Sequence, residues 1–365
     1  MNNIVEFNYI NEKDKELVEL FIESKKIKKY ILGINKFTKS VLKYIEVDGI
    51  IDDFTRVQSS RKKEILKIDD IPKDAVILWT ASGSPLEVKN RLDDLGFKNF
   101  SYLSFYRYSA FDLAHPPFIM DFKDDFLNNK DRYSEVYDLL EDKKSKVVFE
   151  KVINFKITFD YNFMDGFTND FDKQYFEPDI IPPIKNITFL DGGGYVGDTT
   201  PNIIKNYPDF QKIYLVEPNE LHINIAKRDF GEVKNIEFIN CGLSNKKVTA
   251  INDTKLEQNK TSLENNCDHH YQAQIVDTID NICKGKIDFI KLDIEGAEQD
   301  AIDGAKETIK KYKPILAICV YHKAQDWYKI PQKILAINKD YKIYLRHYME
   351  GIYESVMYFI PKEYK

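Results

Sequence analysis

The first third of the chain alternates between short apolar runs and segments with helical spacing. Four apolar runs have the length and composition of buried strands, and they lie at 30–34, 47–51, 75–80 and 99–106. Helical segments are predicted at 11–27, 37–45 and 84–96, where Ser84-Pro85 suits a helix start and Gly96 a helix end. Strands alternating with helices predict a small domain with a parallel, Rossmann-like sheet over residues 1–110.

A second and more regular series begins at 187. Its strand-like runs lie at 187–191, 213–217, 236–240, 287–293 and 315–321. Helical segments between and after them lie at 198–206, 220–229, 297–312 and 326–337. Two last extended runs, 341–348 and 354–360, predict an antiparallel hairpin around Gly351. Residues 181–365 are therefore predicted to form a doubly wound α/β domain of five parallel strands closed by a hairpin.

Residues 111–180 separate the two predicted domains. Helical spacing runs through 131–155, and the following stretch to 176 is rich in aromatic residues. We predict a helical, aromatic connector, which serves either as a lid over the second domain or as a linker packed on both. The polar stretch 245–270 is predicted to be a loop or hairpin excursion.

Composition excludes several classes of function. The 365 residues carry a net charge of −6, which gives no overall attraction to nucleic acid or to an anionic membrane. No run approaches the ~20 apolar residues of a membrane span, and the start of the sequence lacks signal-peptide features. The four cysteines form no Cys-x-x-Cys pair. We expect a cytoplasmic protein without nucleic-acid partners or membrane insertion, and a homodimer stays open.

The glycine-rich stretch 187–200 predicts a ligand site. Asp191 ends an apolar strand, three glycines follow, and Gly197 precedes a helix. Gly193 and Gly197 suit positive φ angles or close backbone approach. An acid at the head of the turn would repel a pyrophosphate and suits a cationic ligand such as S-adenosylmethionine (SAM). Glu217 ends the next strand, where a ribose-binding carboxylate is expected. The alternative is an ordinary βαβ unit with chance acids.

The carboxyl ends of the predicted parallel strands carry polar side chains that should meet in one crevice. These ends carry Asp191, Glu217, Ser244, Asp293 and His322. We predict catalytic roles for His322 and Asp293, since a histidine of near-neutral pKa suits removal of a hydroxyl proton. Ser244 and Asp293 are also placed in the predicted cofactor set. A hydrogen-bonded structural histidine is the alternative for His322.

Glu295 and Glu298 follow Asp293 in the turn after its strand. Clustered carboxylates raise one another's pKa values and supply a general base, or they bind Mg²⁺, or they stabilise a helix N-terminus. No second ligand group stands at a recognisable spacing, so we predict no metal site.

Several motifs resemble the FkbM family of SAM-dependent methyltransferases over about 175–361. They are Phe-Leu-Asp-Gly-Gly-Gly-Tyr-Val-Gly-Asp-Thr from 189, Val-Glu-Pro-Asn from 216, Phe-Ile-Lys-Leu-Asp-Ile-Glu-Gly-Ala-Glu from 289, Tyr-His-Lys from 321 and Leu-Arg-His-Tyr from 345. The resemblance implies a class I methyltransferase fold and SAM held by Asp191, Gly193, Gly197 and Glu217, with Asp293 near the reacting centre. Gly194 departs from the family, where alanine is common.

The sequence thus predicts an O-methyltransferase acting on a hydroxyl of a sugar or other small molecule, in bacterial surface polysaccharide biosynthesis. One alternative is an N-methyltransferase on an amine or amide. Another is a non-catalytic scaffold whose working part is residues 1–110. A third, an enzyme using NAD or a nucleotide sugar on the N-terminal fold, is disfavoured because further glycines are missing after Gly33.

Overall fold

The computed structural model describes residues 1, 3–6, 8–54, 59–60, 63–248 and 275–364. The chain forms two compact units. Unit 1 comprises Met1–Met120, Glu150–Asn169 and Met349–Ile352, and unit 2 comprises Asp121–Phe149, Asp170–Tyr348 and Tyr353–Lys365. The predicted connector, 111–180, is divided between them. Residues 249–274, which include most of the stretch predicted as a polar loop, lie outside the described residues. No described helix is long and apolar enough to span a bilayer.

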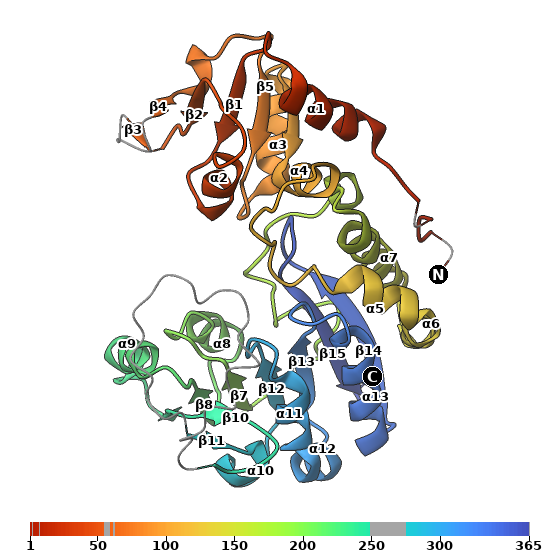
Figure 1. Cartoon of the computed structure of the whole chain (residues 1–365). Coiled ribbons are helices and arrows are strands. Elements are labelled where there is room, and N and C mark those ends of the chain that lie inside the picture. The colour runs from red at the N-terminus through yellow and green to blue at the C-terminus, as the bar shows by residue number, and fades with distance from the viewer. Residues whose placement is uncertain (2, 7, 55–58, 61–62, 249–274, 365) are drawn as a thin grey trace. The chain divides into compact units, whose positions relative to one another are not determined.

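Unit 1 contains the predicted Rossmann-like sheet (Figure 1), in the strand order β3-β4-β2-β1-β5-β6. The strands are β1 (Lys29–Leu32), β2 (Gly49–Ile51), β3 (Ser59–Ser60), β4 (Lys63–Leu66), β5 (Val76–Trp79) and β6 (Lys98–Ser101). All pairs are parallel except β3 with β4. The helices with residues in this unit are α1 (Glu12–Glu23), α2 (Lys36–Val41), α3 (Pro85–Asp94), α4 (Tyr102–Tyr108) and the second half of α7 (Lys143–Thr158).

The predicted strand at 99–106 is wrong in its second half. Strand β6 ends at Ser101, whose hydroxyl accepts a hydrogen bond from the Ser104 N–H at 2.9 Å and caps α4. Phe105 then packs edge-on against Phe21 of α1, with ring centroids 6.2 Å apart. Tyr102, Leu103 and Phe105 are buried, as an apolar run predicts, but they belong to helix α4 and not to a strand.

Unit 2 contains the predicted doubly wound sheet with its closing hairpin. Its strand order is β14-β15-β13-β12-β7-β8-β9, in which β15 is antiparallel to both of its neighbours, β14 and β13, and the other pairs are parallel. The strands are β7 (Thr188–Gly192), β8 (Lys212–Val216), β9 (Ile236–Ile239), β12 (Phe289–Leu292), β13 (Ile315–Cys319), β14 (Tyr341–His347) and β15 (Ser355–Pro361). A separate parallel pair joins β10 (Gly242–Leu243) and β11 (Val276–Asp277).

The helices of unit 2 are the first half of α7 together with α5 (Phe122–Asn128), α6 (Lys130–Leu139), α8 (Thr200–Asn206), α9 (Glu220–Phe230), α10 (Ile279–Ile282), α11 (Glu298–Asp303), α12 (Lys306–Tyr312) and α13 (Asp326–Ile337). The single helix predicted at 297–312 is broken at Gly304. The Gly304 carbonyl accepts a hydrogen bond from the Asp280 N–H at 3.0 Å, and a Cβ at Gly304 would lie 2.1 Å from the Ser244 carbonyl oxygen. The close approach of the backbone at Ser244 therefore requires glycine at position 304, where the helix is interrupted.

The helical spacing predicted for 131–155 corresponds to α6 and α7, and α6 packs on α13. Tyr133 of α6 is fully buried, and its hydroxyl donates to the Ala324 carbonyl at 2.9 Å. Its ring lies edge-on to Phe122, Phe126 and Phe149, and the last of these packs against Trp327. This aromatic cluster places the 121–149 part of the connector in the core of unit 2.

Candidate active site

A buried ion pair lies beneath the glycine turn. Lys291 of β12 is the register partner of Asp191 of β7, and its Nζ lies 2.9 Å from Asp191 Oδ1. The same ammonium donates to the Gly193 carbonyl at 2.8 Å. Burial raises the pKa of Asp191, although Lys291 opposes this. Asp191 has no exposed surface, so its charge is balanced by a residue of the chain itself, and a direct contact with SAM stays a prediction.

Gly193 brings the ends of β7 and β12 into direct contact. Its φ angle is +76°, and a Cβ at this position would lie 1.8 Å from the carbonyl oxygen of Asp293. Gly197 also has positive φ, and a Cβ there would lie 2.7 Å from the ring of Phe230. Both predicted glycines are therefore required by conformation and packing.

Glu217 lies just past the end of β8 and faces the glycine turn. Its two carboxylate oxygens accept from the backbone N–H groups of Tyr195 at 3.1 Å and Asn219 at 2.8 Å. Tyr195 is 49% exposed, and its ring lies edge-on to His222. Each oxygen of Glu217 keeps further acceptor capacity, as a ribose-binding carboxylate must.

Asp293 follows β12 and is held by two tyrosines. Tyr175 donates to its Oδ2 at 2.9 Å and Tyr321 donates to its Oδ1 at 3.0 Å. Burial raises the pKa of Asp293, but Lys291, His322 and the two hydroxyls lower it more, so the carboxylate is ionised. Its side chain is 23% exposed. Tyr175 has a φ of +68°. Its role was not foreseen from the sequence, although Gln174-Tyr175-Phe176 belongs to the family resemblance.

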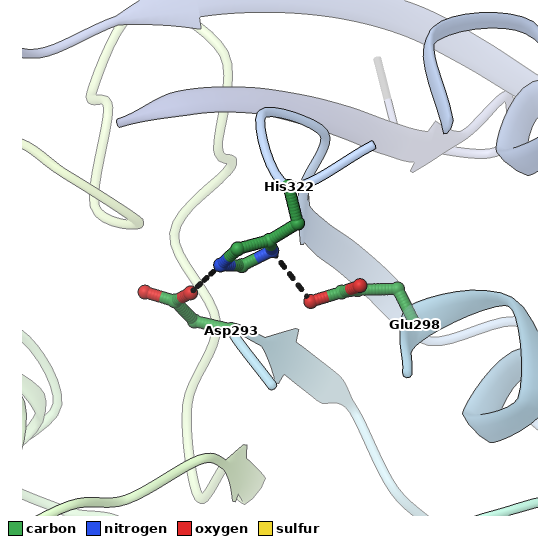
Figure 2. Close-up of side chains that lie close together, drawn as sticks. All are labelled: Asp293, Glu298 and His322. Carbon is green, nitrogen blue, oxygen red and sulfur yellow. Dashed lines mark ion pairs between the residues drawn. The ribbon is translucent and has the colours of Figure 1, made fainter. Parts of the chain in front are cut away.

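His322 lies between two carboxylates (Figure 2). Its Nδ1 is 3.0 Å from Glu298 Oε1, and its Nε2 is 3.5 Å from Asp293 Oδ1. Burial lowers the pKa of His322, but Glu298, Asp293 and Glu295 outweigh it and raise the pKa to about 9. This differs from the near-neutral value expected from the sequence. With these partners the imidazole is charged at neutral pH and does not accept a proton.

Ser244 lies just past the end of β10. Its N–H donates to the Asp277 carbonyl at 3.0 Å, and its own carbonyl packs against Gly304. The described contacts of Ser244 are thus made by its backbone. The structure links Asp191 to Gly193 through Lys291, Gly193 to Asp293 through a close backbone approach, and Asp293 to His322 through an ion pair. Glu217 is joined to the turn through Tyr195, and Ser244 takes no part in these contacts. Its role in binding the cofactor stays a prediction.

Two further buried acids near the site were not foreseen. Burial and the charge of Asp293 raise the pKa of Glu354 to about 7, and its carboxylate accepts from Gln174 Nε2. Asp326, with no exposed surface, also has its pKa raised to about 7, by burial and by Glu298. Neither follows a parallel strand, so the rule that sites lie at strand ends could not identify them.

In unit 1, side chains already occupy the helix N-termini that would bind phosphate. Asn35 accepts from the N–H groups of Phe37 and Thr38 at the start of α2. At the start of α3, Glu350 Oε2 accepts from the N–H groups of Leu86 and Glu87 at 2.9 and 3.0 Å. Asp14, Asp93 and Asp160 line a cavity of about 30 Å³, which has room for water and not for a nucleotide.

The sequence of residues 185–347 matches the methyltransferase FkbM domain. Residues 185–347 form an FkbM methyltransferase domain. The match runs from the segment before β7 to the end of β14, and so includes both the glycine turn and the His322 cluster. The predicted family and the predicted methyltransferase class are confirmed. A comparison with curated proteins found no significant match.

Solved structures match this chain over nearly all of its length or over about half of it. The FkbM methyltransferase of Methylobacillus flagellatus is 21% identical, with a TM-score of 0.74 over 96% of this chain and 94% of that one, which shows a shared fold. A SAM-dependent methyltransferase from Aquifex aeolicus has a TM-score of 0.32 at 15% identity, over 55% of this chain and 98% of its own. Fibrillarin from Aeropyrum pernix has a TM-score of 0.31 at 13% identity, over 49% and 69%.

Gly193→Ala should destabilise unit 2 strongly, because the new Cβ would collide with the Asp293 carbonyl. The matched control is Gly96→Ala, which has nearly the same φ, +77°, but open space around it. The control should show only the cost of positive φ, roughly 1–2 kcal/mol. Urea unfolding followed by circular dichroism measures both variants. Equal losses would show that the collision is relieved without cost.

Asp326 should make unit 2 less stable as pH rises. Its folded pKa of about 7 exceeds the ordinary 3.8, so protonated Asp326 favours the fold, and this contribution is lost between about pH 4 and pH 7. At about 1.4 kcal/mol per pKa unit, the loss is at most about 4 kcal/mol. Glu298 raises this pKa, while Gln299, Lys323 and His322 lower it.

The free energy of unfolding of Asp326→Asn should therefore fall less over this pH range than that of the wild type. Urea titrations at a series of pH values measure the difference. Asp300→Asn, at an exposed acid of α11, is the control and should keep the wild-type slope. A wild-type slope in Asp326→Asn would show that Asp326 ionises normally in the fold.

Proposed function

We propose that the FkbM domain transfers the methyl group of SAM to a hydroxyl of a sugar or another small molecule. The contact between Gly193 and Asp293 carries this proposal, because it joins the predicted cofactor turn directly to a partly exposed, ionised carboxylate. A methyl donor in the turn and an acceptor on Asp293 would thus meet at the ends of adjacent strands.

The residues of the turn fit SAM as the cofactor. Glu217 offers carboxylate oxygens with spare acceptor capacity to the ribose hydroxyls, beside the exposed ring of Tyr195. When bound, SAM supplies an electrophilic methyl group on a sulfonium that is a good leaving group. Positioning of the acceptor by the protein should then account for most of the acceleration.

Asp293 is the residue that we assign to the acceptor. Its carboxylate is held in place by Tyr175 and Tyr321, so it can orient a hydroxyl and take up its proton as the C–O bond forms. The charge on His322 in this arrangement argues against its acting as the base. An anionic Asp293 would hold an amine as its unreactive ammonium form, which favours O-methylation over N-methylation.

The finer parts of the proposal rest on the family resemblance. They are a sugar acceptor, a surface polysaccharide pathway and a cytoplasmic setting. The three described cysteines, Cys241, Cys283 and Cys319, are free, which fits a reducing compartment.

We assign unit 1 to substrate presentation or packing, because the helix N-termini at α2 and α3 are occupied by Asn35 and Glu350.

Glu217→Gln should weaken SAM binding about 10- to 100-fold, the cost of losing charge-assisted hydrogen bonds of about 1.5–3 kcal/mol. Glu220→Gln, three residues further on and exposed, is the matched control and should bind like the wild type. Isothermal calorimetry with SAM measures both variants. Absence of binding by folded wild-type protein would refute the assignment of the cofactor.

Asp293→Asn should lower kcat about 10²- to 10⁴-fold while SAM binding stays within a few-fold of wild type. The assay screens nucleotide-activated sugars with SAM and detects the methylated product by mass spectrometry. Glu307→Gln, at an exposed acid of α12, is the control and should keep the wild-type kcat. Methylation only of amines in this screen would favour the N-methyltransferase alternative.

A further inference from the structure

The two nitrogens of His322 face different sets of carboxylates. Glu298 Oε1 is 3.0 Å from Nδ1, whereas Asp293 Oδ1 and Glu295 Oε2 lie 3.5 and 3.7 Å from Nε2. Figure 2 shows the imidazole between Asp293 and Glu298. The sequence contained no second ligand group at a recognisable spacing, but the fold brings His322 from the end of β13 to the acids that follow β12.

We propose that His322 Nε2, Asp293 and Glu295 bind one divalent transition-metal ion. In a tetrahedral site with bonds of about 2.0–2.2 Å, neighbouring ligand atoms lie about 3.3–3.6 Å apart. The separations of 3.5 and 3.7 Å from Nε2 are close to this spacing. Among the described residues the acids and histidine whose ligand atoms all lie within 4.8 Å of one another are Asp293, Glu298 and His322, so the Glu295 carboxylate must turn toward Asp293 when the ion binds. The Glu295 side chain is 70% exposed, so it can complete the site without disturbing the core.

Glu298 is placed to orient the histidine and not to bind the ion. Its Oε1 accepts from the backbone N–H groups of Ile294 at 3.0 Å and Gly296 at 3.4 Å, which fixes the carboxylate opposite Nδ1. Carboxylates that hold the second nitrogen of a ligand histidine are typical of metal sites. The Asp293 carboxylate is fixed in the same way by Tyr175 and Tyr321.

The charges of the cluster also favour a cation. Three carboxylates surround one imidazole, and Glu298 Oε2 is buried without a hydrogen-bond partner among the residues that the structure describes. Lys323, nearby in sequence, donates to the Gly296 carbonyl. A bound ion takes the place of the proton on Nε2, so the neutral imidazole and the three carboxylates leave a net negative charge that the divalent ion offsets. A mixed nitrogen and oxygen ligand set suits Mn²⁺ or Zn²⁺ better than Mg²⁺.

Metal binding can be measured on the full-length protein after treatment with a chelator. Mn²⁺ is titrated with detection of the free ion by electron paramagnetic resonance, and Zn²⁺ and Mg²⁺ are titrated by calorimetry. We expect one site per chain that prefers Mn²⁺ or Zn²⁺ to Mg²⁺. No saturable binding by protein with a folded circular dichroism spectrum would overturn the proposal.

Variants locate the site. Glu295→Gln should weaken binding at least tenfold and Glu298→Gln by about 10- to 100-fold, whereas the exposed control Glu307→Gln should not change it. Unchanged affinity in Glu295→Gln would reveal an adventitious site and overturn the proposal. The proposed site does not depend on the proposed function: metal binding and SAM binding are measured separately, so the failure of one is distinguishable from the failure of the other.

Discussion

The buried ion pair between Asp191 and Lys291 holds together the two strands that carry the site. Taking two charges out of water is costly, and the pair is sustained because Lys291 also bonds to the Gly193 carbonyl and lies over the ring of Tyr175. Loss of one partner would leave an uncompensated buried charge, at a cost of about 3–5 kcal/mol. The position of the glycine turn against Asp293 therefore depends on this pair.

Around this ion pair, acidic side chains outnumber basic ones. Asp293 stays ionised because Lys291, His322 and two tyrosines stabilise its charge, whereas Glu354 and Asp326 have fewer such partners and their pKa values rise. Buried carboxyl groups of one site thus have pKa values that are shifted in opposite directions. The partners, and not the depth of burial, decide which acid carries charge at neutral pH.

The order and type of most strands could be predicted because each buried strand is a short apolar run ending in a polar residue. That rule selected Asp191, Glu217 and Asp293 as candidate site residues. What the sequence could not show was pairing across strands. Lys291 appeared only as a member of the family motif that begins at 289, yet it neutralises Asp191. His322 appeared as a base, yet Glu298 holds it as a cation. These partners are 100 and 24 residues apart in sequence and are adjacent only in the fold.

The same reasoning explains why unit 1 resembles a nucleotide-binding domain without offering its phosphate site. A helix N-terminus attracts anions because its first N–H groups lack partners. At the start of α2 these N–H groups donate to Asn35. At the start of α3 they donate to the carboxylate of Glu350, which comes from the segment between β14 and β15. An anion of the chain thus stands where a phosphate would bind. The N–H groups at the starts of α2 and α3 are therefore bonded by side chains of the chain itself.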